Sequence, residues 1–518
     1  ANPWRECNVN RNFHLIVKGA RSTLGPLVIA ASVVVSGAAF AASEEHKGPR
    51  KMSPEAKQVE HNKGVFGSDP TYEDKPYSAE EQLKIYGGKT PLDPPRPLVE
   101  IGRPIYVEGP LGEGINLIGE KNRLFPGFNI TGDWRTAVAL NDNGNVETGQ
   151  IATRLNLELD LNLTGTERIH AFIRPLDQGG QFTRYEFFGD DRDQGDAVFD
   201  VNLQTLFFEG DLGAIYQGLA DKYTNIDLPI SFGLMPVLFQ NGVWAEDAFI
   251  GGAFAIPAKN SPKLDISNMD FSFFGGVDKV TTPAIRDEKG DLADHGVNIY
   301  GAAAFIETLE GYFEAGFGRI DGDGNFDDLS YNSATLAFTR RYGRRLTNSV
   351  RGIWTFGQDA DNQQQTADGF IFLVENSIIT HLPSTLVPYF NMWIGFDRPQ
   401  PLADDSGLLK NTGINFETDG LTGFPKLDDT ANDTWGGAIG IQYLFNLDQQ
   451  IVVEAATVQP FGGNSIGTNA GGDQYALGVR YQLPISATWI IRADAMYGWR
   501  ENNLEDIAGA RLEFRRKF

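Results

Sequence analysis

The chain has 518 residues and a formal net charge of −24 at pH 7. This length suits two or three ordinary soluble domains or one large β-barrel with loops. The acidic balance argues against a nucleic-acid-binding protein, because no basic stripe is present. A mean hydropathy of −0.27 still allows a membrane barrel, in which every second strand residue faces a wet lumen.

The N-terminal segment, 1–41, has the pattern of a secretory signal peptide. Lys18 and Arg21 precede an apolar run over 24–40, and Ala39-Phe40-Ala41 supplies the small residues of a cleavage site. We therefore expect cleavage after Ala41. The alternative is an uncleaved membrane anchor, which would need a longer apolar run. The single cysteine lies in this segment, so we expect the mature chain to contain no disulfide.

Residues 42–125 differ from the rest of the chain in being rich in proline, glycine and charge, as 89–97 illustrates. This composition is typical of extended or polyproline-like chain. One short helix is predicted after the capping box 78–81, and it should end at Gly87-Gly88. The segment is either a periplasmic extension, a plug that reaches into a lumen, or a solvated linker.

From residue 126 to 518, long stretches alternate between apolar and polar side chains. The clearest are 128–140, 151–163, 475–483 and 489–499. Such alternation predicts strands with one apolar and one polar face. Each run is longer than the mean strand of a globular protein, and a tilted strand of this length can cross a membrane.

The connections between these stretches alternate in length. Counting back from the C-terminal end, short links of a few residues alternate with long polar ones, a parity typical of short periplasmic turns and long external loops. Both ends of the barrel region should lie on the periplasmic side, so the number of strands is even. We expect 18 strands, two of them in 251–278, with 16 as the alternative. The long links are 279–293, 321–328, 359–367, 398–433 and 460–472.

The last strand, 508–518, reads AGARLEFRRKF, with apolar residues on one face and charged residues on the other. A closing strand that ends in an aromatic residue, here Phe518, resembles the C-terminal strand of Gram-negative outer-membrane β-barrels. The expected architecture is similar to that of substrate-specific porins, and the stretch 228–244 resembles alginate-exporter-like channels. The resemblance implies an all-β, transmembrane antiparallel barrel in the bacterial outer membrane. It also implies contact with lipid and lipopolysaccharide, and insertion by the barrel-assembly machinery through the strand that ends in Phe518. The resemblance is compatible with a homo-oligomer.

Closing the barrel pairs its first and last strands, which brings their charged inward faces together. Arginine side chains bind carboxylates and hydroxyls, and interleaved acids set a field across a pore. These residues are therefore expected to line a pore for anionic or hydroxylated solutes. The alternative is a charge network that any wet barrel wall needs. The predicted pore-lining residues are Asp133, Arg135, Arg154, Glu158, Asp160, Arg480, Arg492, Asp494, Arg511, Glu513 and Arg515.

The segment 239–256 is long and partly apolar. Trp244, Glu246 and Asp247 could place it in the lumen as a constriction loop. The alternative is an external loop that packs on its neighbours.

Metal binding and catalysis find little support. Residues 321–328 carry oxygen ligands, but Phe326 replaces the glycine that a calcium loop of the EF-hand type requires. The histidines are not placed to form a hydrolase triad, and no CxxCH sequence is present to attach haem. We therefore expect no metal, no cofactor and no enzyme. The sequence predicts an outer-membrane channel for small polar solutes. The alternative is a dedicated exporter of alginate-like polysaccharide, or a barrel that sheathes a partner such as a cytochrome.

Overall fold

The computed structural model describes residues 95–105, 112–189, 192–361, 364–415, 420–445, 449–461, 470–502 and 504–518. The expected signal peptide, its cleavage site after Ala41 and the predicted short helix lie outside the described residues.

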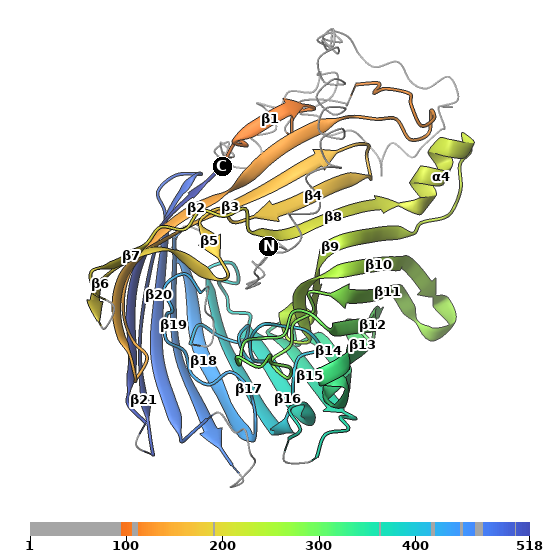
Figure 1. Cartoon of the computed structure of the whole chain (residues 1–518). Helices are drawn as coiled ribbons and strands as arrows, with labels where there is room; N and C mark the ends of the chain where they lie inside the picture. Colours follow the sequence, from red (N-terminus) through yellow and green to blue (C-terminus); the bar gives the residue numbers. More distant parts are fainter. Residues whose placement is uncertain are drawn as a thin grey trace, which may run out of the picture. The chain divides into compact units, whose positions relative to one another are not determined.

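The described chain forms a closed antiparallel β-barrel of 18 strands, as the sequence predicts (Figure 1). The barrel begins with β2 (Gly127–Asp142), β3 (Glu147–Asn162), β4 (Arg168–Ile173), β6 (Gln181–Gly189), β7 (Gln194–Asp196), β8 (Leu203–Asp211), β9 (Pro229–Phe239), β10 (Ala245–Ser261), β11 (Ile266–Asp278), β12 (Val297–Thr308) and β13 (Gly311–Gly322). It continues with β14 (Tyr331–Tyr342), β15 (Leu346–Phe356), β16 (Asp368–Ile378), β17 (Leu386–Arg398), β18 (Thr434–Phe445), β19 (Gln449–Pro460), β20 (Gln474–Pro484), β21 (Trp489–Arg500) and β22 (Ile507–Lys517).

Two of the 18 strands are interrupted. β4 and β6 both pair with β3, one with each half of it, so they form the third strand together. β7 pairs with β6 and β8 pairs with β4, so these two form the fourth strand. The short strand β5 (Asp177–Gln178) pairs with β6 inside the first interruption.

The sheet closes where β22 pairs with β2, in a register that places Arg511 opposite Ala139 and Arg515 opposite Arg135. The remaining end of β2 pairs with β1 (Val99–Gly102). Strands β10 and β11 occupy the weakly patterned region in which two strands were expected, which confirms the even count.

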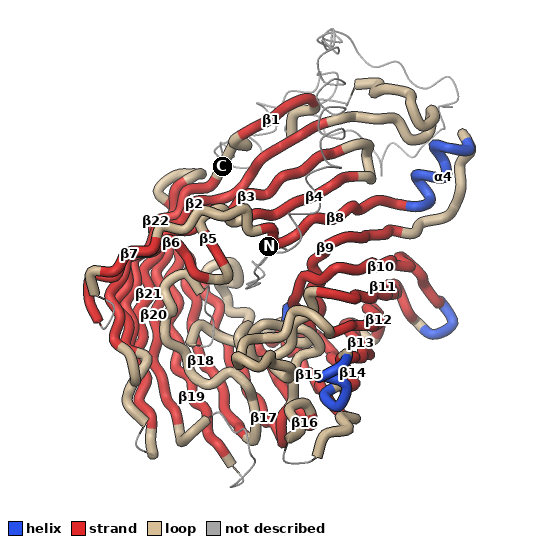
Figure 2. The backbone as a smooth tube through the Cα atoms, viewed as in Figure 1, coloured by secondary structure: helices blue, strands red, loops and turns tan. Residues whose placement is uncertain are grey.

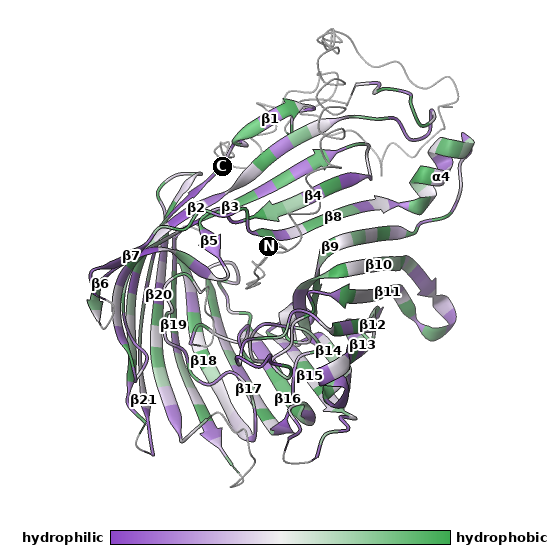
Figure 3. Cartoon of the chain, in the orientation of Figure 1, coloured by the Kyte–Doolittle hydropathy of each residue, from purple (hydrophilic) through white to green (hydrophobic). Residues whose placement is uncertain are grey.

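The two faces of each strand differ in their surroundings, as β2 illustrates. Trp134 and Leu140 are about half exposed on the outer face, whereas Ala137 and Ala139 are buried on the inner face. Alternating hydrophobic and hydrophilic bands run along the strands in Figure 3. An apolar outer face suits lipid, because hydrocarbon cannot hydrogen-bond with polar side chains.

One end of the barrel carries short links, such as Leu309-Glu310 between β12 and β13. The exception at this end is the link between β8 and β9, which contains helix α4 (Leu212–Ala220). The Asp211 side chain caps this helix by accepting a hydrogen bond from the Ala214 amide. Short 3₁₀ helices η1 (Gln240–Gly242), η2 (Pro262–Leu264) and η3 (Gly324–Leu329) lie in other links. Among the described residues, no helix is long and apolar enough to cross a membrane.

The opposite end carries the long links, at 279–296, 323–330, 357–367, 399–433 and 461–473. Their positions match the expected ones within a few residues. Parts of these links lie within the ring of strands (Figure 2). Buried residues of these links, such as Ile285, Leu402 and Leu409, belong to one hydrophobic cluster. The same cluster contains Trp244 and Phe249.

Candidate functional site

The inner faces of β20, β21 and β22 meet around a single carboxylate, Asp494. Arg480 Nε donates to Asp494 Oδ1 at 2.7 Å, and Arg492 Nε donates to Asp494 Oδ2 at 2.9 Å. Arg511 donates twice to Asp494 Oδ2, from Nη2 at 2.7 Å and from Nε at 3.0 Å. The pairing of the strands places Asp494 directly opposite both Arg480 and Arg511. Three guanidinium groups therefore share one buried carboxylate.

A second buried carboxylate, Asp133, lies on β2 next to this group. Arg135 donates to Asp133 Oδ2 from Nε and Nη2, both at 3.1 Å, and Arg515 of β22 forms an ion pair with the same oxygen. Asn156 Nδ2 donates to Asp133 Oδ1 at 2.7 Å. Arg154 of β3 lies opposite Arg135 in the pairing of β2 with β3 and is fully buried.

These basic residues form one continuous patch on five neighbouring strands, from β20 to β3. We call it the arginine wall, and it consists of Arg135, Arg154, Arg480, Arg492, Arg511 and Arg515. The strand register interleaves three acids with it, Asp133, Asp494 and Glu513. Two further acids, Asp177 and Glu454, lie close enough to interact with Arg154 and Arg480. The six arginines therefore outnumber these five carboxylates by one. The sequence predicted these residues, but not which acid each arginine contacts.

Glu158 and Asp160, the other two predicted pore-lining residues, belong to a neighbouring group of charges on β3. They are nearer the short-link end of β3, where Asp160 contacts His170 Nδ1 at 2.8 Å and Arg168 Nη1 at 3.3 Å. Arg168 also forms an ion pair with Glu209. Glu158 also lies close enough to Asp133 for the two carboxylates to interact, so this network adjoins the arginine wall.

The long link 399–433 folds into the barrel, and we call it the lumen loop. It leaves the wall at β17, yet the Leu402 amide donates to the Trp244 carbonyl at 2.7 Å, and the Glu246 amide donates to the Ala403 carbonyl at 2.8 Å. Strands β11 to β16 separate β10 from β17 around the wall. The loop must therefore cross the lumen to make these contacts.

Further along, the lumen loop is held by the opposite wall. Glu454 of β19 accepts hydrogen bonds from the amides of Ile414 and Asn415, both at 3.0 Å. Gln150 Nε2 of β3 donates to the Thr422 carbonyl at 2.8 Å. The Phe424 ring lies 5.4 Å from the Arg511 guanidinium, so the loop touches the arginine wall itself.

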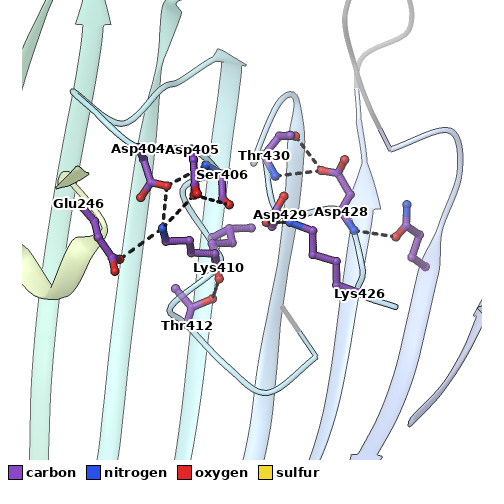
Figure 4. Close-up of polar contacts among 12 residues, drawn as sticks. Glu246, Asp404, Asp405, Ser406, Lys410, Thr412, Lys426, Asp428, Asp429 and Thr430 are labelled. Carbon is purple, nitrogen blue, oxygen red and sulfur yellow. Dashed lines mark hydrogen bonds and ion pairs between the residues drawn. The ribbon is translucent and has the colours of Figure 1, made fainter. Parts of the chain in front are cut away.

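An ion-pair cluster anchors the lumen loop on β10 (Figure 4). Lys410 Nζ lies 2.7 Å from Asp404, 3.3 Å from Glu246 and 3.5 Å from Asp405, and all four side chains are largely buried. Burial alone would lower the pKa of Lys410, but the three carboxylates outweigh it and hold this pKa well above its ordinary value. Asn411 Nδ2 also donates to Glu246 at 2.8 Å.

A second polar cluster lies further along the loop (Figure 4). Lys426 forms an ion pair with Asp429, while Asp428 accepts hydrogen bonds from the hydroxyl and the amide of Thr430 at 2.7 and 3.2 Å. Burial raises the pKa of Asp428 to about 6, against the effect of the Thr430 hydrogen bonds. The Asp428 amide donates to Gln474 of β20 at 3.0 Å, which ties this part of the loop to the wall.

The segment 239–256 is not a constriction loop of its own. It consists of the end of β9, a short turn and the first part of β10. Trp244 is fully buried and donates from Nε1 to Ser333 Oγ at 3.0 Å, and Asp247 accepts a hydrogen bond from the Thr281 amide at 2.7 Å. The apolar residues that suggested a separate loop instead form part of the wall against which the lumen loop packs.

The loop that does enter the lumen was expected to be external. Its length and polarity indicated a long link, but neither shows the direction in which a link folds. The signal that could have revealed it is the apolar group Leu402, Leu408 and Leu409, which has no reason to occur in a link surrounded by water.

Among the described residues, no three histidine, cysteine, aspartate or glutamate side chains are grouped so that they could hold a metal ion. The segment 321–328, which carries calcium-type ligands in sequence, forms the end of β13 and the first part of η3.

No protein-family model and no curated protein matches the chain. Solved structures do match. OccAB4 of Acinetobacter baumannii shares 12% identity, with a TM-score of 0.50 over 76% of this chain and 98% of that one. OccK2 (OpdF) of Pseudomonas aeruginosa shares 9% identity, with a TM-score of 0.50 over 76% and 97%. The chain has the fold of an outer-membrane channel. These matches give no support to the resemblance to alginate exporters.

Proposed function

We propose that the chain is an outer-membrane channel through which small polar solutes diffuse, with a preference for anions. The outer face fits this location, because exposed side chains such as Trp134, Leu140 and Phe514 suit contact with lipid and lipopolysaccharide. The observation that carries the solute preference is the arginine wall, in which Asp494 is shared by three arginines. An excess of guanidinium groups on a lumen face attracts carboxylates and repels cations.

The lumen loop supplies the second element that a selective channel needs. It crosses the barrel at the level of Glu246 and Glu454 and contacts the arginine wall through Phe424. A solute that passes this loop therefore comes close to the excess positive charge. A charge at short range in a narrow, partly desolvated passage acts more strongly than it would in bulk water.

The same loop weighs against a barrel that sheathes a partner protein. Its anchors, Lys410 at β10 and Glu454 at β19, lie on different parts of the wall, so its own chain occupies space that a threaded partner would need. A second alternative is that the arginine wall only balances charge. It differs from the proposed function in predicting no selectivity between anions and cations.

Single-channel recording of residues 42–518 in a planar bilayer tests the proposal. We expect steady conductance and a reversal potential in a salt gradient that indicates anion preference. Substitution of Arg492 or Arg511 by alanine should lower the anion-to-cation permeability ratio by about threefold. Arg345→Ala, in the exposed turn between β14 and β15, is the matched control and should leave the ratio unchanged. A folded barrel without conductance would overturn the channel, and equal selectivity in all variants would overturn the role of the arginine wall.

A further inference from the structure

A polar pocket opens at the long-link end of the barrel, separate from the arginine wall. Its volume is about 650 Å³, and it is lined by the lumen loop, the links 279–296 and 357–367, and the loop-side ends of β20 and β21. We propose that this pocket, which we call the mouth pocket, binds a neutral polyhydroxylated solute of the size of a di- or trisaccharide. The role of such binding rests on the proposed channel function, since a site at the mouth would concentrate a solute before it passes the lumen loop.

The size and lining of the mouth pocket exclude several classes of ligand. Small-molecule sites have volumes of roughly 300–1,000 Å³, so the mouth pocket is larger than a simple ion requires. Among its side chains, only Pro283 and Leu427 are apolar, so a lipid-like ligand would lose its hydration without gaining apolar contacts. A polar organic solute remains.

The charges of the mouth pocket are largely neutralised by neighbouring groups. Lys426 is paired with Asp429, and Arg398 donates from Nε to Asp368 Oδ1 at 2.9 Å. Asp405 lies 3.5 Å from the Lys410 ammonium. Counting the whole lining, four basic side chains (Arg286, Arg398, Lys426 and Arg500) face three acidic ones (Asp405, Asp428 and Asp429), so the pocket carries only a small net charge with which to select an ion.

The uncharged polar groups of the pocket match hydroxyls. Its lining includes the amides of Gln364, Gln400 and Gln474 and the hydroxyls of Ser406 and Thr430. An amide presents donors and an acceptor side by side. The Ser406 and Thr430 hydroxyls donate to Asp405 and Asp428 and keep their oxygens as acceptors. Sugar hydroxyls can therefore donate to both kinds of group and accept from the amides. Charged solutes gain less from this arrangement. An anion can use only the NH₂ donors of an amide, and a cation can use only its carbonyl oxygen.

Two lining residues can be changed without disturbing the fold. Gln364 is exposed, and the exposed Arg286 side chain donates to the Gly290 carbonyl of its own link, at 2.9 Å. Arg192, in the exposed link between β6 and β7, and Gln194, the exposed first residue of β7, lie outside the pocket lining and are matched controls of the same residue types.

Isothermal titration calorimetry of residues 42–518 in detergent, with maltotriose as the probe, tests the proposal. We expect saturable binding that does not change with salt concentration, because the probe is neutral. Gln364→Ala and Arg286→Ala should each weaken binding by about fivefold, the effect of one lost hydrogen bond, whereas Gln194→Ala and Arg192→Ala should not. Absence of saturable binding, or equal binding by all variants, would overturn the mouth pocket as a sugar site.

This outcome is distinguishable from a failure of the proposed channel. Calorimetry needs no conduction, so a barrel that binds maltotriose but does not conduct would overturn the channel and leave the binding site in place. A barrel that conducts with anion preference but does not bind maltotriose would do the reverse.

Discussion

The Nζ atom of Lys410 lies 3.3 Å from a carboxylate oxygen of Glu246, and this ion pair joins the lumen loop to β10 on another part of the wall. Asp404 and Asp405 contact the same ammonium from within the loop. One cation therefore compensates three carboxylates and fixes the position of the loop in the lumen.

We expect Lys410→Met to release this end of the lumen loop. Removal of one partner of a buried ion pair leaves the other charges uncompensated and costs about 3–5 kcal/mol. The barrel should stay folded, since its strands are joined by backbone hydrogen bonds that do not involve Lys410. Single-channel conductance should rise, because the released loop obstructs the lumen less. Lys289→Met, at an exposed lysine in the link 279–296, should change neither. Unaltered conductance in Lys410→Met would show that this anchor does not set the width of the passage.

Glu454 anchors the loop at a second point, where it accepts from two loop amides and from the Tyr389 hydroxyl at 2.5 Å. We expect Glu454→Ala to increase amide hydrogen exchange at Ile414 and Asn415 by at least about tenfold, because both amides lose their acceptor. Tyr389→Phe is the control, since it removes only the hydroxyl and leaves both amide bonds. Similar exchange in the two variants would mean that the loop is not held by Glu454.

Asp494 is in direct contact with all three of Arg480, Arg492 and Arg511. Asp494→Asn should raise the anion-to-cation permeability ratio, because it adds one unit to the excess positive charge. It should also lower the free energy of unfolding in urea by about 3–5 kcal/mol, since three guanidinium groups lose their shared partner. Asp265→Asn, in the turn between β10 and β11, should affect neither measurement. A ratio that stays constant or falls would contradict the role assigned to Asp494.

Asp428 predicts a pH dependence of the lumen loop. Its pKa in the folded protein is raised from 3.8 to about 6, so the folded state favours the protonated form. This stabilisation is complete below about pH 4 and is lost as the pH rises through about 6. We therefore expect the protection factor of the Thr430 amide, normalised to the intrinsic exchange rate at each pH, to fall between pH 4 and 7.

The variant Asp428→Asn should remove this pH dependence, because its amide is neutral throughout. Asp227→Asn, at an exposed residue in the link between β8 and β9, should retain it. If the protection factor is independent of pH in the unmodified chain, Asp428 does not titrate in this range.

The sequence alone was sufficient to predict the barrel and much of its charged wall. Alternation with period 2 is a local property, since successive side chains of a strand point to opposite faces. The parity of the links then required an even number of strands, and closure of the sheet predicted that Asp133 and Arg135 lie near Arg511 and Arg515. In the structure Arg515 lies opposite Arg135, and Arg511 lies four residues away along β22. These steps depend only on neighbours along the chain and on the geometry of a closed sheet.

Only the tertiary structure decided what fills the lumen. The direction of the lumen loop depends on contacts between residues far apart in sequence, such as Lys410 with Glu246 and Ile414 with Glu454. No local pattern records these contacts, because a charged or polar loop residue such as Lys410 is compatible with water until a partner on the wall is supplied. The sharing of Asp494 among three arginines is likewise set by strand register, which fixes how charges on three separate strands meet.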